Sequence, residues 1–231
     1  MFGLKAKMFR GTSCAYRQEI GGTRGAHKNT TAAGLGSGLV AGTLVATALG
    51  WRPVETLIEG DLVLTFDGGM QPVRAVKKGL HWDSAHACPK ALLPLQVPAG
   101  ALGNQIKMTL LPEQCTMLES DAADMLFGDP FTLLKAVDLD GFRGITRVIP
   151  DCQLEVVQLQ FNDDEVIFAN MGALVFCPSM KVINVAELLE ARPDALRYDT
   201  LSNGTAKLLV ECLIDEDAVC PPDAIQMAVS A

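Results

Sequence analysis

Residues 38–69 read GLVAGTLVATALGWRPVETLIEGDLVLTFDGG, and this stretch decides the fold class. Residues 43–47 and 62–66 are short runs of β-branched and apolar residues, which favour strands. Between them Pro53 suits the first position of a single helical turn, and Gly68-Gly69 after Asp67 has the composition of a turn. Short strands with frequent turn signals predict an all-β fold.

The same pattern continues along the chain. Further short strands are predicted at residues 73–77, 93–97, 106–111 and 116–119. The clearest hairpin joins residues 154–161 to residues 165–169 through the turn Asn162-Asp163-Asp164. No helical periodicity is evident before residue 183, whereas residues 185–191 and 206–214 each predict a short helix.

The chain is therefore expected to have three parts. Residues 1–37 are basic and glycine-rich and are interpreted as an arm and linker. Residues 38–178 form the β domain, and residues 179–231 form a C-terminal extension with short helices.

Charge is distributed unevenly over the 231 residues. The net charge is −8, from 19 Lys plus Arg against 27 Asp plus Glu. Residues 1–36 hold six cations and one acid, or +5, so the rest carries −13. Because phosphate binding needs a basic footprint, a general nucleic-acid binder is excluded. A basic arm before an acidic body indicates that the arm docks on the body of its own or another chain; the identity of any protein or peptide partner is unknown.

The seven cysteines favour reduced thiols. Their number is odd and no Cys-x-x-Cys pair occurs, which excludes a structural zinc site of the usual spacing and disfavours a disulfide framework. Cys115 and Cys177 lie in apolar strand contexts and are expected to be buried and inert. His81, His86 and Cys88 are interpreted as surface residues without a role. Phosphate-loop motifs are absent, so no cofactor and no metal are expected, and the absence of a secretory signal favours the cytoplasm.

Residues 30–51 carry no charge, and Gly34, Gly38 and Gly42 recur every four residues, as on close-packing faces of membrane helices. However, the segment is rich in threonine and glycine, and its second half alternates in the manner of a strand. Stable membrane insertion is therefore not expected, and a membrane-anchored protein is kept as a second alternative.

The stretch that opens the β domain closely resembles the first block of the Hedgehog/intein (Hint) domain family. The resemblance rests on Gly42-Thr43, on Pro53-Val54-Glu55, and on Gly60-Asp61 with the Asp-Gly turn that follows. Residues 98–104, 111–118 and 165–169 resemble later blocks of the bacterial branch, in the same order. The likeness covers about residues 38–178 and implies a horseshoe-like all-β fold.

Active members of that family cleave their own chain. The resemblance therefore implies which positions of this chain would carry that chemistry. A Cys or Ser at the first residue of the domain attacks the preceding carbonyl, and a histidine of the second block protonates or polarises the junction. In this chain these two positions are Gly38 and Gln114. Glycine has no nucleophile and glutamine does not exchange a proton near neutral pH, so both positions are interpreted as vestigial.

Three neighbours are weighed as substitutes: Ser37 before the junction, Thr43 after it, and Cys115 beside Gln114. Use of Ser37 would shift the spacing to Gly42, and Cys115 should face the other side of its strand from Gln114. The leading hypothesis is a degenerate, non-processing member that serves as a binding or structural module and is not an enzyme. The competing hypothesis is autoproteolysis at the Ser37–Gly38 bond.

Overall fold

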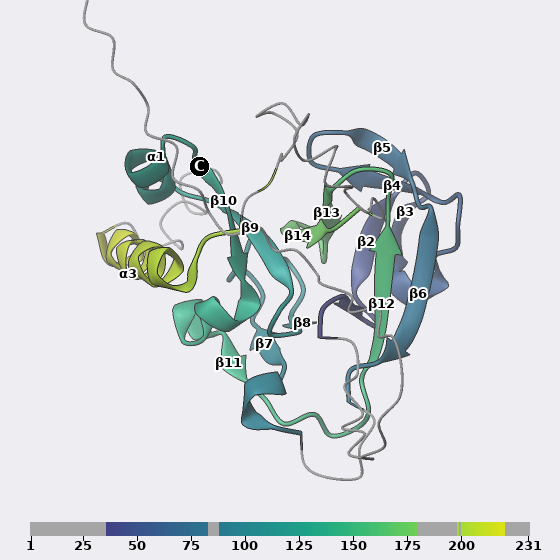
Figure 1. Ribbon diagram of the computed structural model, residues 1–231, viewed down its shortest axis with the longest axis horizontal. Helices are drawn as coiled ribbons and strands as arrows, with labels where there is room; N and C mark the ends of the chain where they lie inside the picture. The colour runs from purple at the N-terminus through teal and green to yellow at the C-terminus, as the bar shows by residue number, and fades with distance from the viewer. Residues whose placement is uncertain (1–35, 83–87, 180–197, 199, 220–231) are drawn as a thin grey trace, which may run out of the picture.

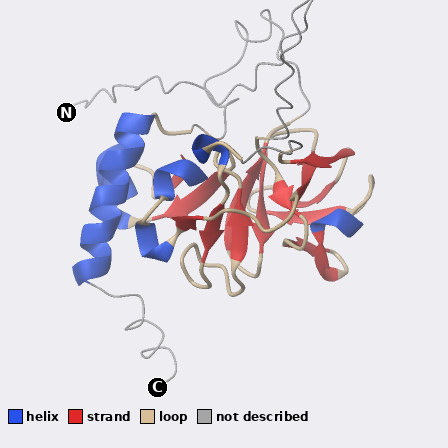
Figure 2. Cartoon of the chain, turned by 90° about the horizontal axis from the view of Figure 1, so that it is seen from below, coloured by secondary structure: helices blue, strands red, loops and turns tan. Residues whose placement is uncertain are grey.

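The computed structural model describes residues 36–82, 88–179, 198 and 200–219 (Figure 1). Strands dominate it, as Figure 2 shows in red, and all their ladders are antiparallel. The predicted all-β class is confirmed. Residues 1–35 of the predicted arm (1–37) and the predicted helix at residues 185–191 lie outside the described residues.

One sheet has six strands. Their order across the sheet is β11 (Thr146–Arg147), β7 (Leu95–Val97), β8 (Met108–Leu110), β1 (Leu39–Val40), β12 (Glu155–Gln160) and β6 (Ala75–Leu80). The short strand β1 therefore lies between β8 and β12, so the chain enters the domain through the middle of a sheet. Val156 and Val157 of β12 are fully buried, which fixes the inner part of this sheet in the core.

The second sheet has eight strands. Seven follow the order β10 (Phe131–Lys135), β9 (Cys115–Glu119), β14 (Ala173–Cys177), β13 (Glu165–Ala169), β2 (Leu44–Thr47), β4 (Leu62–Thr65) and β5 (Gly69–Pro72), and β3 (Gly50–Pro53) pairs with β2. Phe142 and Phe161 are the largest fully buried side chains. Pro53 precedes one turn of 3-10 helix, η1 (Val54–Thr56), as the sequence predicted.

The predicted hairpin between residues 154–161 and 165–169 is wrong. Both strands exist, as β12 and β13, but β12 pairs with β6 and β1, whereas β13 pairs with β14, β2 and β4 in the other sheet. Between them Phe161 is buried, and the Asp164 carboxylate accepts the Ser179 backbone N–H at 2.7 Å. The acidic turn at residues 162–164 therefore connects a strand of one sheet to a strand of the other, and it does not form a hairpin.

Among the described residues, two α-helices lie together at one end of the molecule (Figures 1 and 2). The sequence pattern missed α1 (Asp121–Phe127), which Ser120 caps by accepting the Ala123 N–H at 3.0 Å and which ends at Gly128 in the left-handed region. The second, α3 (Asn203–Val219), confirms the helix predicted at residues 206–214 and is longer. Its buried residues, Ala206, Leu209, Val210 and Leu213, belong to the main core.

Residues 39–53 form β1, β2 and β3, each paired with other strands, so the described part of the uncharged segment is not helical. Among the helices that the structure describes, none combines the length and the apolar character needed to span a bilayer.

Candidate functional site

The start of the β domain lies beside the turn between β8 and β9. Gly38 directly precedes β1, and β1 pairs with β8. Gln114 closes the turn that follows β8, because its backbone N–H donates to the Leu111 carbonyl at 3.0 Å. Leu111 is fully buried and anchors this turn. Two positions 76 residues apart, which the sequence analysis selected together, thus come together in space.

The two polar groups of the Ser37–Gly38 peptide bond, its N–H and its carbonyl oxygen, each form a hydrogen bond with a glutamine side chain. The Gly38 N–H donates to Gln114 Oε1 at 2.8 Å, and Gln158 Nε2 of β12 donates to the Ser37 carbonyl oxygen at 2.9 Å. The junction is therefore held in one geometry from both sides, and the donor at the carbonyl oxygen polarises that bond.

The Gln114 side chain is 4% exposed. Besides accepting from Gly38, its amide nitrogen donates to the carbonyls of Cys115 at 3.0 Å and of Phe176 in β14 at 2.8 Å. Both amide hydrogens are used, so this side chain links the domain entry, β9 and β14. A neutral amide with these contacts binds and orients its partners, but it has no proton to transfer near neutral pH.

Position 38 has no room for a side chain. The φ of Gly38 is +129°, a conformation that is essentially confined to glycine. An added Cβ would lie 2.7 Å from Val156 Cγ1, 3.0 Å from Gln158 Cγ and 3.1 Å from the Val157 carbonyl oxygen. The position expected to bear the nucleophile is closed by backbone conformation and by packing against β12.

Thr43 is buried and faces a different environment. Its hydroxyl donates to the Val40 carbonyl at 2.6 Å, and it lines a small pocket of about 170 Å³ together with residues 40–42, Gln96, residues 107–109 and Asn170. The Asn170 carboxamide spans this pocket's edge, accepting from Leu44 N at 2.7 Å and donating to the Lys107 carbonyl at 3.1 Å. These contacts make Thr43 a structural residue of the β1–β2 turn.

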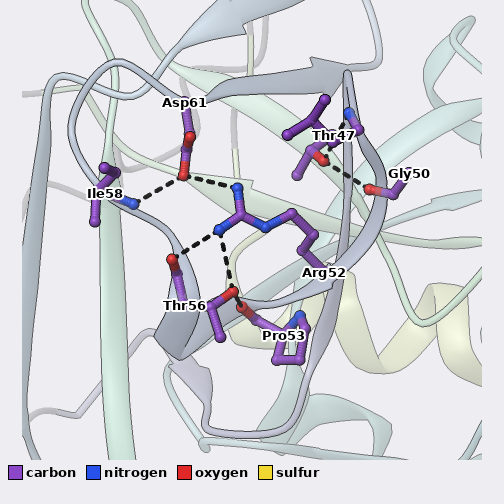
Figure 3. Close-up of polar contacts among 8 residues, drawn as sticks. Thr47, Gly50, Arg52, Pro53, Thr56, Ile58 and Asp61 are labelled. Atoms are coloured by element: carbon purple, nitrogen blue, oxygen red, sulfur yellow. Dashed lines mark hydrogen bonds and ion pairs between the residues drawn. The ribbon is translucent and has the colours of Figure 1, made fainter.

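The resemblance residues of the first block brace that turn. Glu55 of η1 accepts the Gly42 N–H at 2.8 Å. The Arg52 guanidinium binds Asp61 at 3.1 Å and the Thr56 carbonyl at 2.9 Å (Figure 3). Because Asp61 also accepts the Ile58 N–H at 3.0 Å, one arginine joins β3, η1 and the start of β4, and the motif has a structural explanation.

The nearby thiols lie in an apolar cluster or are held protonated. Cys115 Sγ lies 3.8 Å from Thr200 Oγ1 and Cys115 belongs to the second apolar cluster. Cys177 is buried. Burial is the larger cause, and the negative charge of Glu165 the smaller one, that together raise the pKa of its thiol to about 12. A thiol with this pKa has almost no thiolate at neutral pH and is inert as a nucleophile.

Two contributors to the site were not selected from the sequence, Val156 and Gln158. Their side chains pack against residues 37–38, yet β12 reads as an ordinary alternating strand, so periodicity gave no indication of their role. No group of three or more His, Cys, Asp and Glu side chains able to hold a metal occurs among residues 36–82, 88–179, 198 and 200–219. His81 is buried with Nε2 2.6 Å from the Leu92 carbonyl oxygen, which corrects its interpretation as a surface residue; His86 lies outside the described part.

Comparison with known families agrees with the resemblance. A family model described as the Hint domain matches residues 37–174. Among solved structures, a bacterial intein-like domain from Clostridium thermocellum is 15% identical with a TM-score of 0.43, over 61% of this chain and 98% of that one. A splice-inactive variant of the AceL NrdHF class 3 split intein is also 15% identical with a TM-score of 0.43, over 62% and 99%. Comparison with curated proteins gave no match.

Proposed function

The chain belongs to the Hint domain family, and we propose that it is a member that does not process itself and serves as a structural or binding module. The observation that carries the proposal is the contact between the Gly38 N–H and Gln114 Oε1 at 2.8 Å, in a position where a Cβ has no space. The nucleophile and the proton donor of the family chemistry are both replaced by groups that hold the junction.

Neither Gly38 nor Gln114 supplies what cleavage of the Ser37–Gly38 bond requires. Cleavage of an amide needs a group that attacks the carbonyl and a proton for the leaving nitrogen, and general acid help contributes on the order of 10²–10⁴-fold. Gly38 has no attacking atom. Gln114 Oε1 accepts from the leaving nitrogen, so the hydrogen bond runs in the direction opposite to proton delivery. The geometry thus favours retention of the peptide bond.

The alternative is autoproteolysis at Ser37–Gly38, and one contact favours it. Gln158 Nε2 donates to the carbonyl oxygen of this bond at 2.9 Å, which is where charge develops when a carbonyl is attacked. Yet the Ser37 hydroxyl is positioned in sequence to attack the carbonyl of residue 36, one bond earlier. An attacking group for the Ser37–Gly38 bond is therefore absent from the residues that hold it.

The proposal is tested by separating stability from cleavage in two variants of the full chain. Gln114→Ala leaves the Gly38 N–H and the carbonyls of Cys115 and Phe176 without their buried partner, at a cost of about 1–3 kcal/mol for each such group. We expect a clearly lowered Tm with no cleavage product in wild type or variant. Ser37→Ala is the control, and we expect it to unfold like wild type. A 38–231 fragment that forms in wild type and is lost in either variant would overturn the proposal in favour of autoproteolysis.

A further inference from the structure

Helix α1 exposes an unusual apolar surface. Met125 is 86% exposed, Leu126 43% and Phe127 39%, whereas Ala122 and Ala123 in the first turn of the helix are buried. Three consecutive large apolar side chains in contact with solvent at one end of a seven-residue helix are typical of a surface that binds another segment.

The surroundings of this surface are acidic. Asp121 and Asp124 of α1 are exposed, and α3 packs beside α1 (Figures 1 and 2). The Glu216 carboxylate accepts the Ala122 N–H at 2.6 Å, which places this part of α3 at the start of α1. We call residues 121 and 124–127 the helical face.

The chain itself contains a segment complementary to the helical face. Residues 1–10, MFGLKAKMFR, hold five large apolar side chains and three cations, Lys5, Lys7 and Arg10, with no acid. Apolar and basic side chains together match a surface that combines apolar and acidic ones, because opposite charges steer the encounter and apolar burial stabilises it. We propose that residues 1–10 dock on the helical face of the same chain.

The connection is long enough for this arrangement. Residues 11–36 are glycine-rich, and a flexible linker of 26 residues has a root-mean-square span of about 25–30 Å. A folded domain of about 160 residues has a radius of gyration of roughly 15 Å and is therefore about 40 Å across, which lies within the extended length of 26 residues, about 90 Å. A linker that matches its span gives an effective concentration in the millimolar range, which favours the arm of the same chain over that of a second copy.

Methionine oxidation tests this docking directly, because Met125 is the most exposed residue of the helical face. The full chain is treated with dilute hydrogen peroxide at low salt, and sulfoxide formation at each methionine is followed by peptide mass spectrometry. We expect Met125 to oxidise about fivefold faster in the arm variant Lys5→Glu/Lys7→Glu/Arg10→Glu than in wild type, as for an arm bound most of the time at millimolar effective concentration. High salt should abolish the difference by screening.

Matched variants make the result specific. Arg74→Glu/Lys77→Glu/Lys90→Glu changes the net charge by the same amount on the body and should leave Met125 protected. Asp121→Lys/Asp124→Lys should expose Met125 with the native arm and restore its protection with the reversed arm. Met117, which is 3% exposed, should stay unoxidised in every variant that is folded.

Equal oxidation of Met125 in wild type and the arm variant, at low and high salt alike, would overturn the proposal. Protection that increases with protein concentration would also overturn it, since it would assign the arm to a second copy. The wild-type salt comparison needs no substitution, so the test holds even if a variant fails to fold.

Discussion

Replacing Gly38 by alanine is the perturbation that the structure makes most informative. The substitution places a Cβ in a conformation with φ of +129°, at a cost of about 1–3 kcal/mol. The same Cβ approaches Val156 Cγ1 to 2.7 Å, and overpacking of a buried site costs about another 1–3 kcal/mol. We expect a loss of about 2–6 kcal/mol in the free energy of unfolding, a large part of the stability of an ordinary domain.

Two other glycines separate these contributions. At Gly42 φ is +88° and an added Cβ meets no atom within 4 Å, so Gly42→Ala carries the backbone cost without the steric one. At Gly36 the Cβ again meets nothing and φ lies outside the left-handed region, so Gly36→Ala should be neutral or stabilising by up to about 1 kcal/mol. The expected order of stability is Gly36→Ala, then Gly42→Ala, then Gly38→Ala.

The assay is reversible urea unfolding followed by circular dichroism, with thermal unfolding as a second measure. For a chain of this size each kcal/mol lowers Tm by about 2–4 °C, so Gly38→Ala should melt roughly 5–20 °C below wild type. Val156→Ala removes the closest contact, so the double variant should lose less stability than the sum of the two single variants, by a coupling of about 0.5–3 kcal/mol. If Gly38→Ala costs no more than Gly42→Ala, position 38 is open to a side chain and the reasoning about a closed junction is wrong.

Three further predictions concern chemistry and charge. Gly38→Cys should give little thiol-induced cleavage, alone or together with Gln114→His, because the backbone conformation and the Val156 side chain leave a thiol no room at position 38. Rapid cleavage of the single variant by mass spectrometry would show that the position is open and that another group already acts as the acid. Cys177 should resist iodoacetamide at pH 8 in the folded chain, because burial raises its pKa to about 12, and should react after denaturation. The hydrogen bond from Arg143 lowers the pKa of Asp217, so this pair stabilises the fold above the ordinary aspartate pKa and loses its effect as the pH falls through the lowered value. Asp217→Asn should therefore lower Tm at pH 7, and the Tm difference from wild type should shrink as the pH falls below the ordinary aspartate pKa; a difference that does not change with pH would contradict this.

The sequence was sufficient where local patterns determine structure. Alternation and turn composition located β2, β4, β7 and β9 to within a residue or two, and the Pro53 turn follows from proline's fixed φ. The family resemblance selected Gly38 and Gln114, and the structure places them in hydrogen-bond contact. That contact is long-range, so periodicity alone could not have given it.

The failures have a common physical cause. A period of two assigns the faces of a strand but not its neighbours, so the pairing of β12 with β6 and of β13 with β14 was read wrongly as one hairpin. Helix α1 is too short for helical periodicity, although Ser120 and Gly128 are an N-cap residue and a C-terminal glycine that mark its ends. The steric closure of Gly38 depends on Val156, which is 118 residues away in sequence and was recognisable only in the folded chain.

The central claim is that the Ser37–Gly38 junction persists because the groups around it hold it and none attacks it. The most direct measurement is the intact mass of the wild-type chain after overnight incubation at neutral pH, with and without excess thiol. The account predicts one species at the full mass of 24.6 kDa under both conditions. A species with the mass of residues 38–231, growing with time and released faster by thiol, would contradict it.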